Sequence, residues 1–277
     1  MFRGFYTVAS GMIAQQRRTE LLTNNMANAN TPGYKADQSV IRSFPDMLMA
    51  RMGSKSLPVQ DPLSMKKLST VGGISTGVYM QETLPHFEQG QLLETELPTD
   101  IAMLQNTVPI NADGNPGAVL YRLENPVAGE YYTRNGNFTL DADGYLTNPQ
   151  GLYVLSDTGQ RIQLQNDDFQ VEADGRLLAN NQEVARIGVS FSAAPESLLK
   201  EENGLFRTAD GQNLASAYDT DGVAFSMQQG FLEGSTVDSA KTMTEMLTAY
   251  RAFEANQKIL QAYDRSMEKA VNEIGRV

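Results

Sequence analysis

The sequence contains no cysteine, one histidine and no long apolar run. Without cysteine the chain has no disulfide framework, no thiolate metal site and no cysteine nucleophile. A cysteine count of zero in 277 residues also suits a protein that passes through an oxidising compartment without mispaired thiols. Because no stretch of 18 apolar residues occurs, we expect no membrane insertion. The N-terminus has only a short apolar stretch and no cleavage pattern, so we expect no cleaved signal peptide.

Signals for catalysis and metal binding are equally scarce. His86 is the only histidine, and the sequence shows no serine-type triad, phosphate-binding loop or metal-binding helix. Asp141-x-Asp143-Gly144 and Asp219-x-Asp221-Gly222 resemble the start of calcium loops, but neither has a glutamate at the twelfth position. Hairpin turns explain both stretches, and His86 is expected at the surface. We therefore predict that the protein is not an enzyme and has no catalytic residue, metal site or cofactor.

The net charge of −11 is unevenly distributed along the chain. Residues 1–67 hold 9 Lys/Arg and 4 Asp/Glu, a net of +5, whereas residues 68–236 hold 7 and 23, a net of −16. Residues 237–277 hold 6 of each sign. Binding to nucleic acid needs a basic face that neutralises phosphates, so the acidic middle argues against a nucleic-acid partner.

The last forty residues, Val237 to Val277, contain no proline and no glycine before Gly275. Their large apolar residues recur in steps of three and four, which is the period of a helix and not of a strand. A helix from Val237 to Ile274 would be about 57 Å long at 1.5 Å per residue. One reading is an amphipathic helix packed on its own domain. The other is a coiled-coil-like helix whose partner is the N-terminus or another subunit. The predicted packing seam consists of Met243, Met246, Tyr250, Phe253, Leu260, Tyr263 and Met267.

The first residues predict a second, shorter helix. Phe2, Phe5, Tyr6 and Ala9 begin an amphipathic pattern of about 25 residues. The pattern stops in the Asn-rich stretch 24–34, because Asn favours caps and turns, Pro cannot continue a helix and Gly supplies a positive φ. The turn residues expected to fix the exit from this helix are Asn25, Asn28, Thr31, Pro32, Gly33 and Tyr34, followed by an extended segment to Phe44.

The middle of the chain differs from both ends. Residues 45–76 are rich in Met, Ser and Gly, and we expect a short helix near residues 45–52 followed by a long irregular loop. Residues 77–230 show short strand patterns separated by Asn-Gly, Asp-Gly and similar turns. One turn, at Asn135-Gly136, is flanked by two strand patterns, and the stretches 141–148 and 172–179 are two similar hairpin turns.

Several motifs carry a resemblance to a known family. Asn24-Asn25-Met26-Ala27-Asn28-Ala29-Asn30-Thr31-Pro32-Gly33-Tyr34-Lys35 resembles the N-terminal signature of the bacterial flagellar rod and hook proteins. The helix around Tyr250-Arg251-Ala252-Phe253-Glu254-Ala255-Asn256 looks like the C-terminal helix of that family. Landmarks between them are Ser75–Val78, Phe87–Leu92, Tyr132–Phe138, Gly144–Leu146 and Gln229–Glu233. The chain looks most like the distal-rod type. Residues 103–110 depart from the usual Gly-x-Gly-Phe-Phe pattern, which indicates a divergent rod paralogue of the kind that some Gram-positive bacteria carry.

This resemblance implies a structural subunit of the flagellar basal-body rod. Such a subunit self-assembles through its terminal helices into a helical tube that transmits torque from motor to hook. Its implied partners are other copies of itself, neighbouring rod and hook proteins, and the flagellar type III export apparatus. Its implied location is the flagellar basal body, beyond the cytoplasmic membrane.

We therefore predict an α+β fold in which long terminal helices pair in a coiled-coil-like unit beside a mainly β central domain. The expected parts are residues 1–44 (helix and extended segment), 45–76 (loop), 77–230 (β domain) and 231–277 (helix). Two other classes remain open from the residues alone. One is a secreted β-rich module that binds cell-wall glycan and uses the helices as an oligomerisation stalk; the other is a hydrolase with a carboxylate pair.

Overall fold

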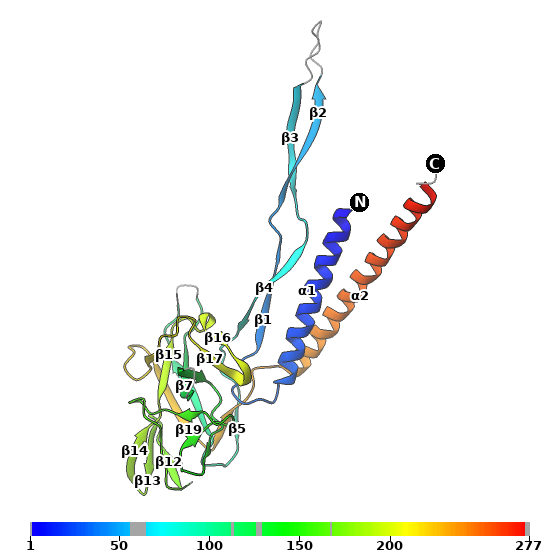
Figure 1. Ribbon diagram of the computed structural model, residues 1–277. Coiled ribbons are helices and arrows are strands. Elements are labelled where there is room, and N and C mark those ends of the chain that lie inside the picture. The colour runs from blue at the N-terminus through cyan, green and yellow to red at the C-terminus, as the bar shows by residue number, and fades with distance from the viewer. Residues whose placement is uncertain (1, 56–64, 112–113, 126–128, 167, 275–277) are drawn as a thin grey trace. The chain divides into compact units, whose positions relative to one another are not determined.

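The computed structural model describes residues 2–55, 65–111, 114–125, 129–166 and 168–274 (Figure 1). It confirms the α+β class, with one helix at each end of the chain and strands between them. The chain divides into two compact units. Unit 1 consists of residues 1–23, 39–83 and 240–277, and unit 2 consists of residues 24–38 and 84–239.

Unit 1 contains the terminal helices and a long two-stranded ribbon. The helix α1 (Phe2–Ala27) ends within the Asn-rich stretch, as its turn-forming residues predict. The helix α2 (Ser239–Lys269) has 31 residues and continues as a π-helical turn, Ala270–Ile274. The helices lie side by side (Figure 1). The remaining elements are β1 (Asp37–Ser43), β2 (Met47–Lys55), β3 (Met65–Ile74) and β4 (Val78–Pro85).

The expected helix near residues 45–52 and the loop after it are wrong. The chain forms the antiparallel pair β2–β3 there, with a register that runs from Met47 opposite Ile74 to Lys55 opposite Met65. The segment is rich in residues with low strand propensity, such as Gly, Ser and Pro, so no strand was predicted. The pairing depends on backbone hydrogen bonds between the strands and not on a local pattern. Pro58 and Pro62 of the expected loop lie outside the described residues.

Unit 2 is built mainly from short antiparallel strands. Its largest sheet has the order β16-β17-β8-β7-β11-β10-β9, and β15 pairs with both β7 and β18. Smaller sheets are β12-β13-β14, β19-β6 and β20-β5. The strands are β5 (Leu92–Glu94), β6 (Ile101–Thr107), β7 (Ala118–Asn125), β8 (Gly129–Thr133), β9 (Thr139–Leu140), β10 (Leu146–Thr147), β11 (Tyr153–Val154), β12 (Phe169–Val171), β13 (Arg176–Ala179), β14 (Gln182–Arg186), β15 (Val189–Ser192), β16 (Leu199–Lys200), β17 (Leu205–Arg207), β18 (Ala215–Ser216), β19 (Ala224–Gln229) and β20 (Phe231–Glu233). Two 3₁₀ turns span Pro195–Ser197 and Glu202–Gly204.

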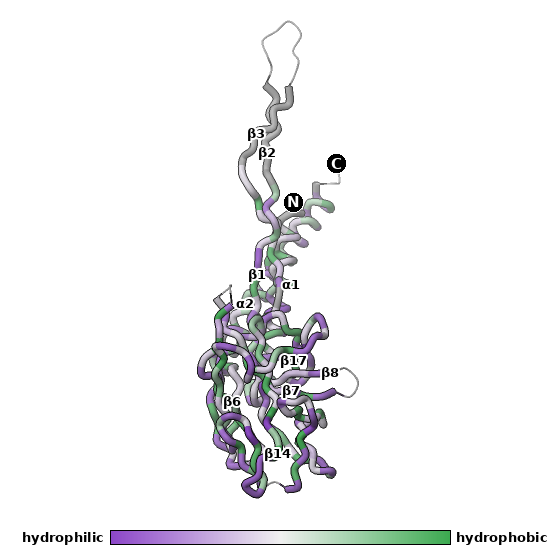
Figure 2. Tube along the Cα trace, turned by 90° about the vertical axis from the view of Figure 1, so that its left-hand side faces the viewer, coloured by the Kyte–Doolittle hydropathy of each residue, from purple (hydrophilic) through white to green (hydrophobic). Residues whose placement is uncertain are grey.

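The core of unit 2 lies between these sheets. Tyr121 and Phe138 pack edge to face there, with ring centroids 5.2 Å apart, and both side chains are fully buried. Hydrophobic and hydrophilic residues are interspersed along the strands and loops of the unit (Figure 2). The principal core residues are Ile101, Met103, Tyr121, Leu123, Phe138, Leu146, Ile162, Leu177 and Ile187.

The turn predictions for unit 2 were partly right. The two similar stretches do form tight turns, between β9 and β10 and between β12 and β13. The strands beside Asn135-Gly136, however, do not pair with each other, since β8 pairs with β7 and β17 and β9 pairs with β10. Residues 103–107, which depart from the family pattern, still lie in a strand, β6, which pairs with β19.

Candidate functional site

The predicted turn residues gather at the C-terminal end of α1 and directly after it, within unit 2. Asn25, in the last turn of α1, makes the central side-chain contacts of this bend. Its Oδ1 accepts a hydrogen bond from the Asp37 amide at 3.0 Å, and its Nδ2 donates to the Asp37 carbonyl at 2.8 Å. The Tyr34 hydroxyl lies 2.8 Å from Oδ1 of Asn24 and 3.1 Å from Oδ1 of Asn25. The Asn25 side-chain amide therefore binds both backbone groups of Asp37, the first residue of β1, and fixes the chain that leaves the turn.

The remaining turn residues complete the same bend. The Thr31 hydroxyl donates to Oδ1 of Asn28 at 3.2 Å, and the Thr31 amide donates to the Asn28 carbonyl at 3.1 Å. Pro32 is half-buried between Thr31 and Gly33. Gly33 has a φ of +69°, and a Cβ at this position would lie 2.5 Å from the Asn135 amide nitrogen. Only glycine fits both the left-handed backbone and this close approach.

Tyr34 is held from outside the turn by a lysine of β16. Nζ of Lys200 lies 4.1 Å from the centroid of the Tyr34 ring and 2.8 Å from Oδ2 of Asp37. Burial raises the pKa of the Tyr34 hydroxyl, and the neighbouring Asp37 carboxylate raises it further. The tyrosine therefore stays protonated as a hydrogen-bond donor to the asparagines. The sequence analysis did not single out Lys200.

A buried ionic network, here called the clasp, consists of Lys35, Arg134 and Glu233. Oε1 of Glu233 lies 2.6 Å from Nζ of Lys35, and its Oε2 lies 2.5 Å from Nε of Arg134. All three side chains are at most 3% exposed. The Gly90 amide also donates to Oε1 of Glu233 at 2.8 Å, and Lys35 also donates to the Glu88 carbonyl. Buried charges are tolerated when they are paired and hydrogen-bonded in this way.

Two cations around one carboxylate set the electrostatics of the clasp. Burial lowers the pKa of Lys35 to about 8, with Arg134 lowering it further and Glu233 only partly opposing the shift. Burial alone would raise the pKa of Glu233, but Arg134 and Lys35 outweigh it and leave that pKa below its ordinary value. Glu233 is therefore ionised at neutral pH, and the lowered pKa of Lys35 brings the titration of this lysine toward neutral pH.

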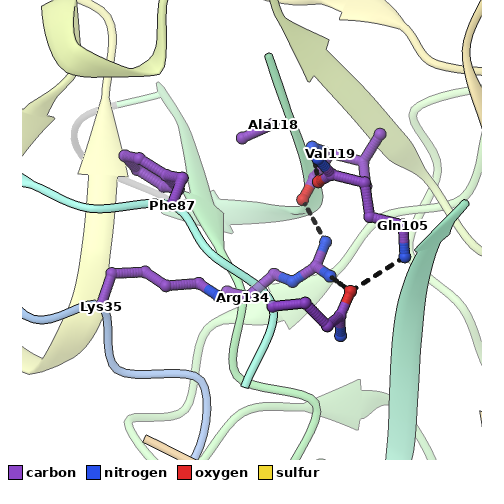
Figure 3. A pocket seen from close by; sticks show the side chains of 7 residues that line it. Lys35, Phe87, Gln105, Ala118, Val119 and Arg134 are labelled. Carbon is purple, nitrogen blue, oxygen red and sulfur yellow. Dashed lines mark hydrogen bonds between the residues drawn. The ribbon is translucent and has the colours of Figure 1, made fainter. Parts of the chain in front are cut away.

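A small cavity of about 10 Å³ lies beside the clasp and has room for one water-sized molecule at most (Figure 3). Its walls include Lys35, Phe87 and Arg134. Figure 3 shows the Arg134 guanidinium pointing toward the Val119 carbonyl, to which Nη1 donates at 2.7 Å. The guanidinium also donates to the Met103 carbonyl and to Gln89. The cavity is too small for an organic ligand, so the clasp is a structural network.

Backbone hydrogen bonds surround the clasp and join two distant segments of unit 2. The Gly33 amide donates to the Glu233 carbonyl at 2.7 Å, and the Thr236 amide donates to the Tyr34 carbonyl at 3.1 Å. The Ala36 amide donates to the Thr236 hydroxyl at 2.9 Å. The segment that follows α1 and the segment that precedes α2 therefore run side by side.

The three clasp residues lie in stretches that resemble the family's motifs, but the sequence did not predict a role for them. Lys35 closes the Asn-rich signature, Arg134 lies within Tyr132–Phe138, and Glu233 ends Gln229–Glu233. In each stretch it is the only charged residue. A lone charge in an otherwise uncharged motif is the signal that could have indicated a buried ion pair, because such a charge needs a partner.

In unit 1 the two terminal helices contact each other in antiparallel order. A Cβ on Gly4 would lie 2.3 Å from the Tyr263 hydroxyl, and one on Gly11 would lie 3.2 Å from Nδ2 of Asn256. Further along α1, Nη2 of Arg18 lies 3.3 Å from Oε2 of Glu245. Residue numbers rise on α1 as they fall on α2. Near these contacts Leu21, Leu22 and Ala249 form a buried cluster with Met80 and Met246 packed against it.

The structure divides the predicted seam residues into two groups. Met246, Phe253, Leu260, Tyr263 and Met267 are half-buried, together with buried Thr242 and Ala249 and half-buried Asn256, in alternating steps of four and three. Met243 and Tyr250 are instead 54% and 59% exposed. The periodicity was correct, but it merged two adjacent stripes, because Met243 and Tyr250 each follow a covered residue and so lie about 100° further around the helix.

Neither unit shows a reactive centre among the residues described. Within them, no group of three or more His, Cys, Asp or Glu side chains could hold a metal ion. Oδ1 of Asp141 accepts hydrogen bonds from the Asp143 and Tyr145 amides, so this calcium-like stretch forms a turn, as predicted. His86 is exposed, also as predicted. No described helix is long and apolar enough to cross a membrane.

Comparison with known proteins shows the family of this chain. The family model "Flagella basal body rod protein" matches residues 5–35, and "Flagellar basal body rod FlgEFG protein C-terminal" matches residues 228–273. A third, "Flagellar hook protein FlgE/F/G D1 domain", matches residues 117–179. The flagellar hook-basal body complex protein FlhO of Bacillus subtilis (strain 168) is 45% identical over 277 residues, which is 100% of each chain. The chain belongs to the flagellar rod and hook-basal body protein family.

More distant members of this family also match almost end to end. The flagellar basal-body rod protein FlgG of Borreliella burgdorferi is 29% identical and covers 98% of each chain. FlgF of Salmonella typhimurium is also 29% identical, over 98% of this chain and 97% of its own. The protein is thus a structural component of the flagellar basal body and not an enzyme. The match to the Bacillus subtilis protein agrees with the expected Gram-positive rod paralogue. The hydrolase and the glycan-binding module are not favoured.

Proposed function

We propose that this protein is a rod subunit that assembles with copies of itself through its terminal helices into a helical tube. The tube passes torque from the motor to the hook. The observation that supports this most strongly is the pair of long helices in unit 1, which leaves large apolar side chains in water. Exposed apolar patches on a soluble protein commonly mark a surface that binds a partner, so these side chains are expected to be buried by neighbouring subunits.

The helix pair acts as one coiled-coil-like element in this proposal. The covered positions on α2, from Thr242 to Met267, follow the alternating steps of four and three that keep one face toward a partner helix. The intrachain seam makes the pair stiff, while Met243 and Tyr250 on its flank are available to neighbouring subunits. Repeated contacts related by a rotation that does not close produce a helical tube.

We propose that the clasp lets unit 2 transmit force between the segments next to the two helices. It ties the segment after α1 to the segment before α2 through Lys35 and Glu233. Force applied to either segment therefore passes into the β core through Arg134. We propose that the turn residues Asn25, Asn28, Thr31, Pro32, Gly33 and Tyr34 fix this attachment.

Neighbouring partners and the route of export follow from the same proposal. The chain would contact other rod and hook proteins at the two ends of its own segment of the tube. It would leave the cytoplasm through the flagellar type III apparatus. The absence of cysteine is compatible with that route.

Isolation of hook-basal bodies from the source bacterium tests the proposal. Quantitative mass spectrometry should find the protein in many copies per basal body, in a fixed ratio to the other rod proteins. Deletion of its gene should shorten or abolish the rod. Absence from basal bodies, or an intact rod in the deletion strain, would refute the proposed role.

A further inference from the structure

Among the residues that the structure describes, each terminal helix has an exposed apolar patch. The α1 patch consists of Tyr6 and Ile13, which are 66% and 51% exposed and seven residues apart. The α2 patch consists of Met243, Leu247 and Tyr250, whose spacing of four and three places them on one face. Leu247 in its centre is 49% exposed. Neither patch belongs to the covered seam.

The α1 patch points away from α2. Gly4 and Gly11 face α2, since they adjoin Tyr263 and Asn256. Tyr6 and Ile13 each follow one of these glycines by two residues, or about 200° around the helix. Their side chains therefore lie on the side of α1 that α2 leaves open.

The same reasoning applies to α2. Ala249 faces α1, because it is buried with Leu21 and Leu22. Leu247 precedes Ala249 by two residues, again about 200°. Met243 and Tyr250 adjoin Leu247 one turn away on either side. The two patches consequently lie on opposite outer sides of the helix pair.

The patches are also offset along the helix axis. The contacts of Gly4 with Tyr263 and Gly11 with Asn256 define the register of the pair. In that register the middle of the α1 patch lies opposite residues 257–258, whereas the α2 patch is centred between residues 246 and 247. At 1.5 Å per residue the offset is about 16 Å. A second copy in the same orientation, moved sideways and by this offset along the axis, would lay one patch on the other.

This shift brings particular residues level with each other. Within one copy Ile13 lies level with residue 254, and a shift of about eleven residues places it level with Met243 of the next copy. Tyr6 comes level with Tyr250 by the same step. Both ends of the α1 patch therefore meet both ends of the α2 patch.

The charges around the patches fit this arrangement. The first turn of α1 contains no acidic residue that would complement the positive end of the helix dipole. Glu254 follows Tyr250 by four residues and extends the α2 patch, although it also pairs with Lys258 at 2.9 Å. In the offset arrangement Glu254 of one copy reaches the first turn of α1 in the next.

We propose that the α2 patch of one copy docks on the α1 patch of a second copy. This inference rests on the proposed assembly and names the contact that drives it. The contact joins two different surfaces on opposite sides of the helix pair with an axial shift. It therefore repeats without closing, which gives a helical assembly and not a symmetric dimer.

Engineered cysteines test the contact, because the native chain has none. Ile13→Cys and Met243→Cys would be made in separate copies and expressed together in place of the native gene. Oxidation of isolated basal bodies should give a disulfide between position 13 of one chain and position 243 of another. The matched control is Gln261→Cys, which is also exposed on α2. It follows Met243 by five full turns, so it shares that face but lies about 27 Å along the axis, and it should give no link to position 13.

The possible outcomes separate the inference from the proposed function. Assembled basal bodies without the link from position 13 to position 243, or with mainly links between like positions, overturn the docking contact and leave the rod role standing. If the wild-type chain is absent from basal bodies, both the docking contact and the proposed rod role are refuted. A charge pair gives a second readout: Ile13→Lys and Met243→Glu should each lower incorporation at least tenfold, and the two variants expressed together should regain it. No recovery would count against the contact.

Discussion

Nζ of Lys35 and Oε1 of Glu233 lie 2.6 Å apart, although 198 residues separate them in the chain. Lys35 follows the first helix and Glu233 ends the last strand, so this ion pair holds together segments from both ends of the sequence. Arg134 joins the pair to the β core through the Val119 and Met103 carbonyls. The stability of unit 2 should therefore depend on the charges of these three residues.

Removal of the Glu233 charge should destabilise unit 2 strongly. Glu233→Gln leaves Lys35 and Arg134 buried without a counter-charge, and breaking such a network costs about 3–5 kcal/mol. Urea unfolding followed by circular dichroism measures this change. The matched control is Glu124→Gln, which breaks the exposed pair with Arg161 and should have a much smaller effect, because solvent screens that pair. Equal effects of the two variants would contradict the structural role of the clasp.

The stability of unit 2 should rise between pH 8 and 10 and fall above pH 10. The pKa of Lys35 is lowered by burial to about 8, so between pH 8 and its ordinary value of 10.5 the unfolded chain holds a proton that the folded chain has lost. Rising pH then favours folding. Burial raises the pKa of Tyr132 to about 12, and also raises those of Tyr121 and Tyr218. Above pH 10 the unfolded chain loses these protons first, so rising pH favours unfolding.

Urea midpoints measured from pH 7 to 12 would show this maximum. In Lys35→Met the rise between pH 8 and 10 should disappear, while the fall above pH 10 remains. If Lys35→Met kept the same rise, the pKa of Lys35 in the folded protein would not be lowered.

Gly33→Ala should destabilise the protein more than Gly151→Ala. Both glycines have positive φ, +69° and +79°, so alanine meets backbone strain of about 1–2 kcal/mol at either position. At Gly33 the new Cβ would also lie 2.5 Å from the Asn135 amide nitrogen, whereas at Gly151 nothing lies within 4 Å. The difference between their unfolding free energies therefore isolates the close approach. No difference would mean that the turn can relax away from Asn135.

Ser190→Ala should leave stability unchanged or raise it slightly. The Ser190 hydroxyl is fully buried and has no hydrogen-bond partner among the described residues. Removing a buried polar group that is not bonded relieves a desolvation penalty of about 1–3 kcal/mol and leaves only a small cavity. Thr133→Val is the control, because the Thr133 hydroxyl donates to the Gly204 carbonyl at 3.2 Å and accepts from the Asn135 amide. A thermal melt should show a loss only for the threonine variant.

Local patterns predicted the parts of this protein that local physics determines. The spacing of apolar side chains predicted both helices, and the Asn, Pro and Gly residues predicted the end of α1 near Ala27. The same spacing could not separate covered Phe253 from exposed Tyr250. That distinction depends on which face of α2 contacts α1, and the sequence of α2 alone does not determine that face.

Long-range pairing explains what the sequence did not reveal. The partners of Glu233 are 99 and 198 residues away, and no motif states that they meet. The β2–β3 ribbon was missed because its Gly, Ser and Met residues have no clear alternation, and the two strands are defined by their mutual register. The sequence indicates two strand patterns that flank Asn135-Gly136 but does not state their partners, and in the structure each strand pairs with a different one.

The most direct test of the account is the incorporation of Tyr250→Asp into basal bodies, measured beside Gln261→Asp. Both variants place one new carboxylate at an exposed position of α2, and neither position belongs to the covered seam. We predict that both proteins fold with wild-type stability, that Gln261→Asp is incorporated and supports motility, and that Tyr250→Asp is not incorporated. Normal incorporation of Tyr250→Asp would contradict assembly through the exposed faces of the terminal helices.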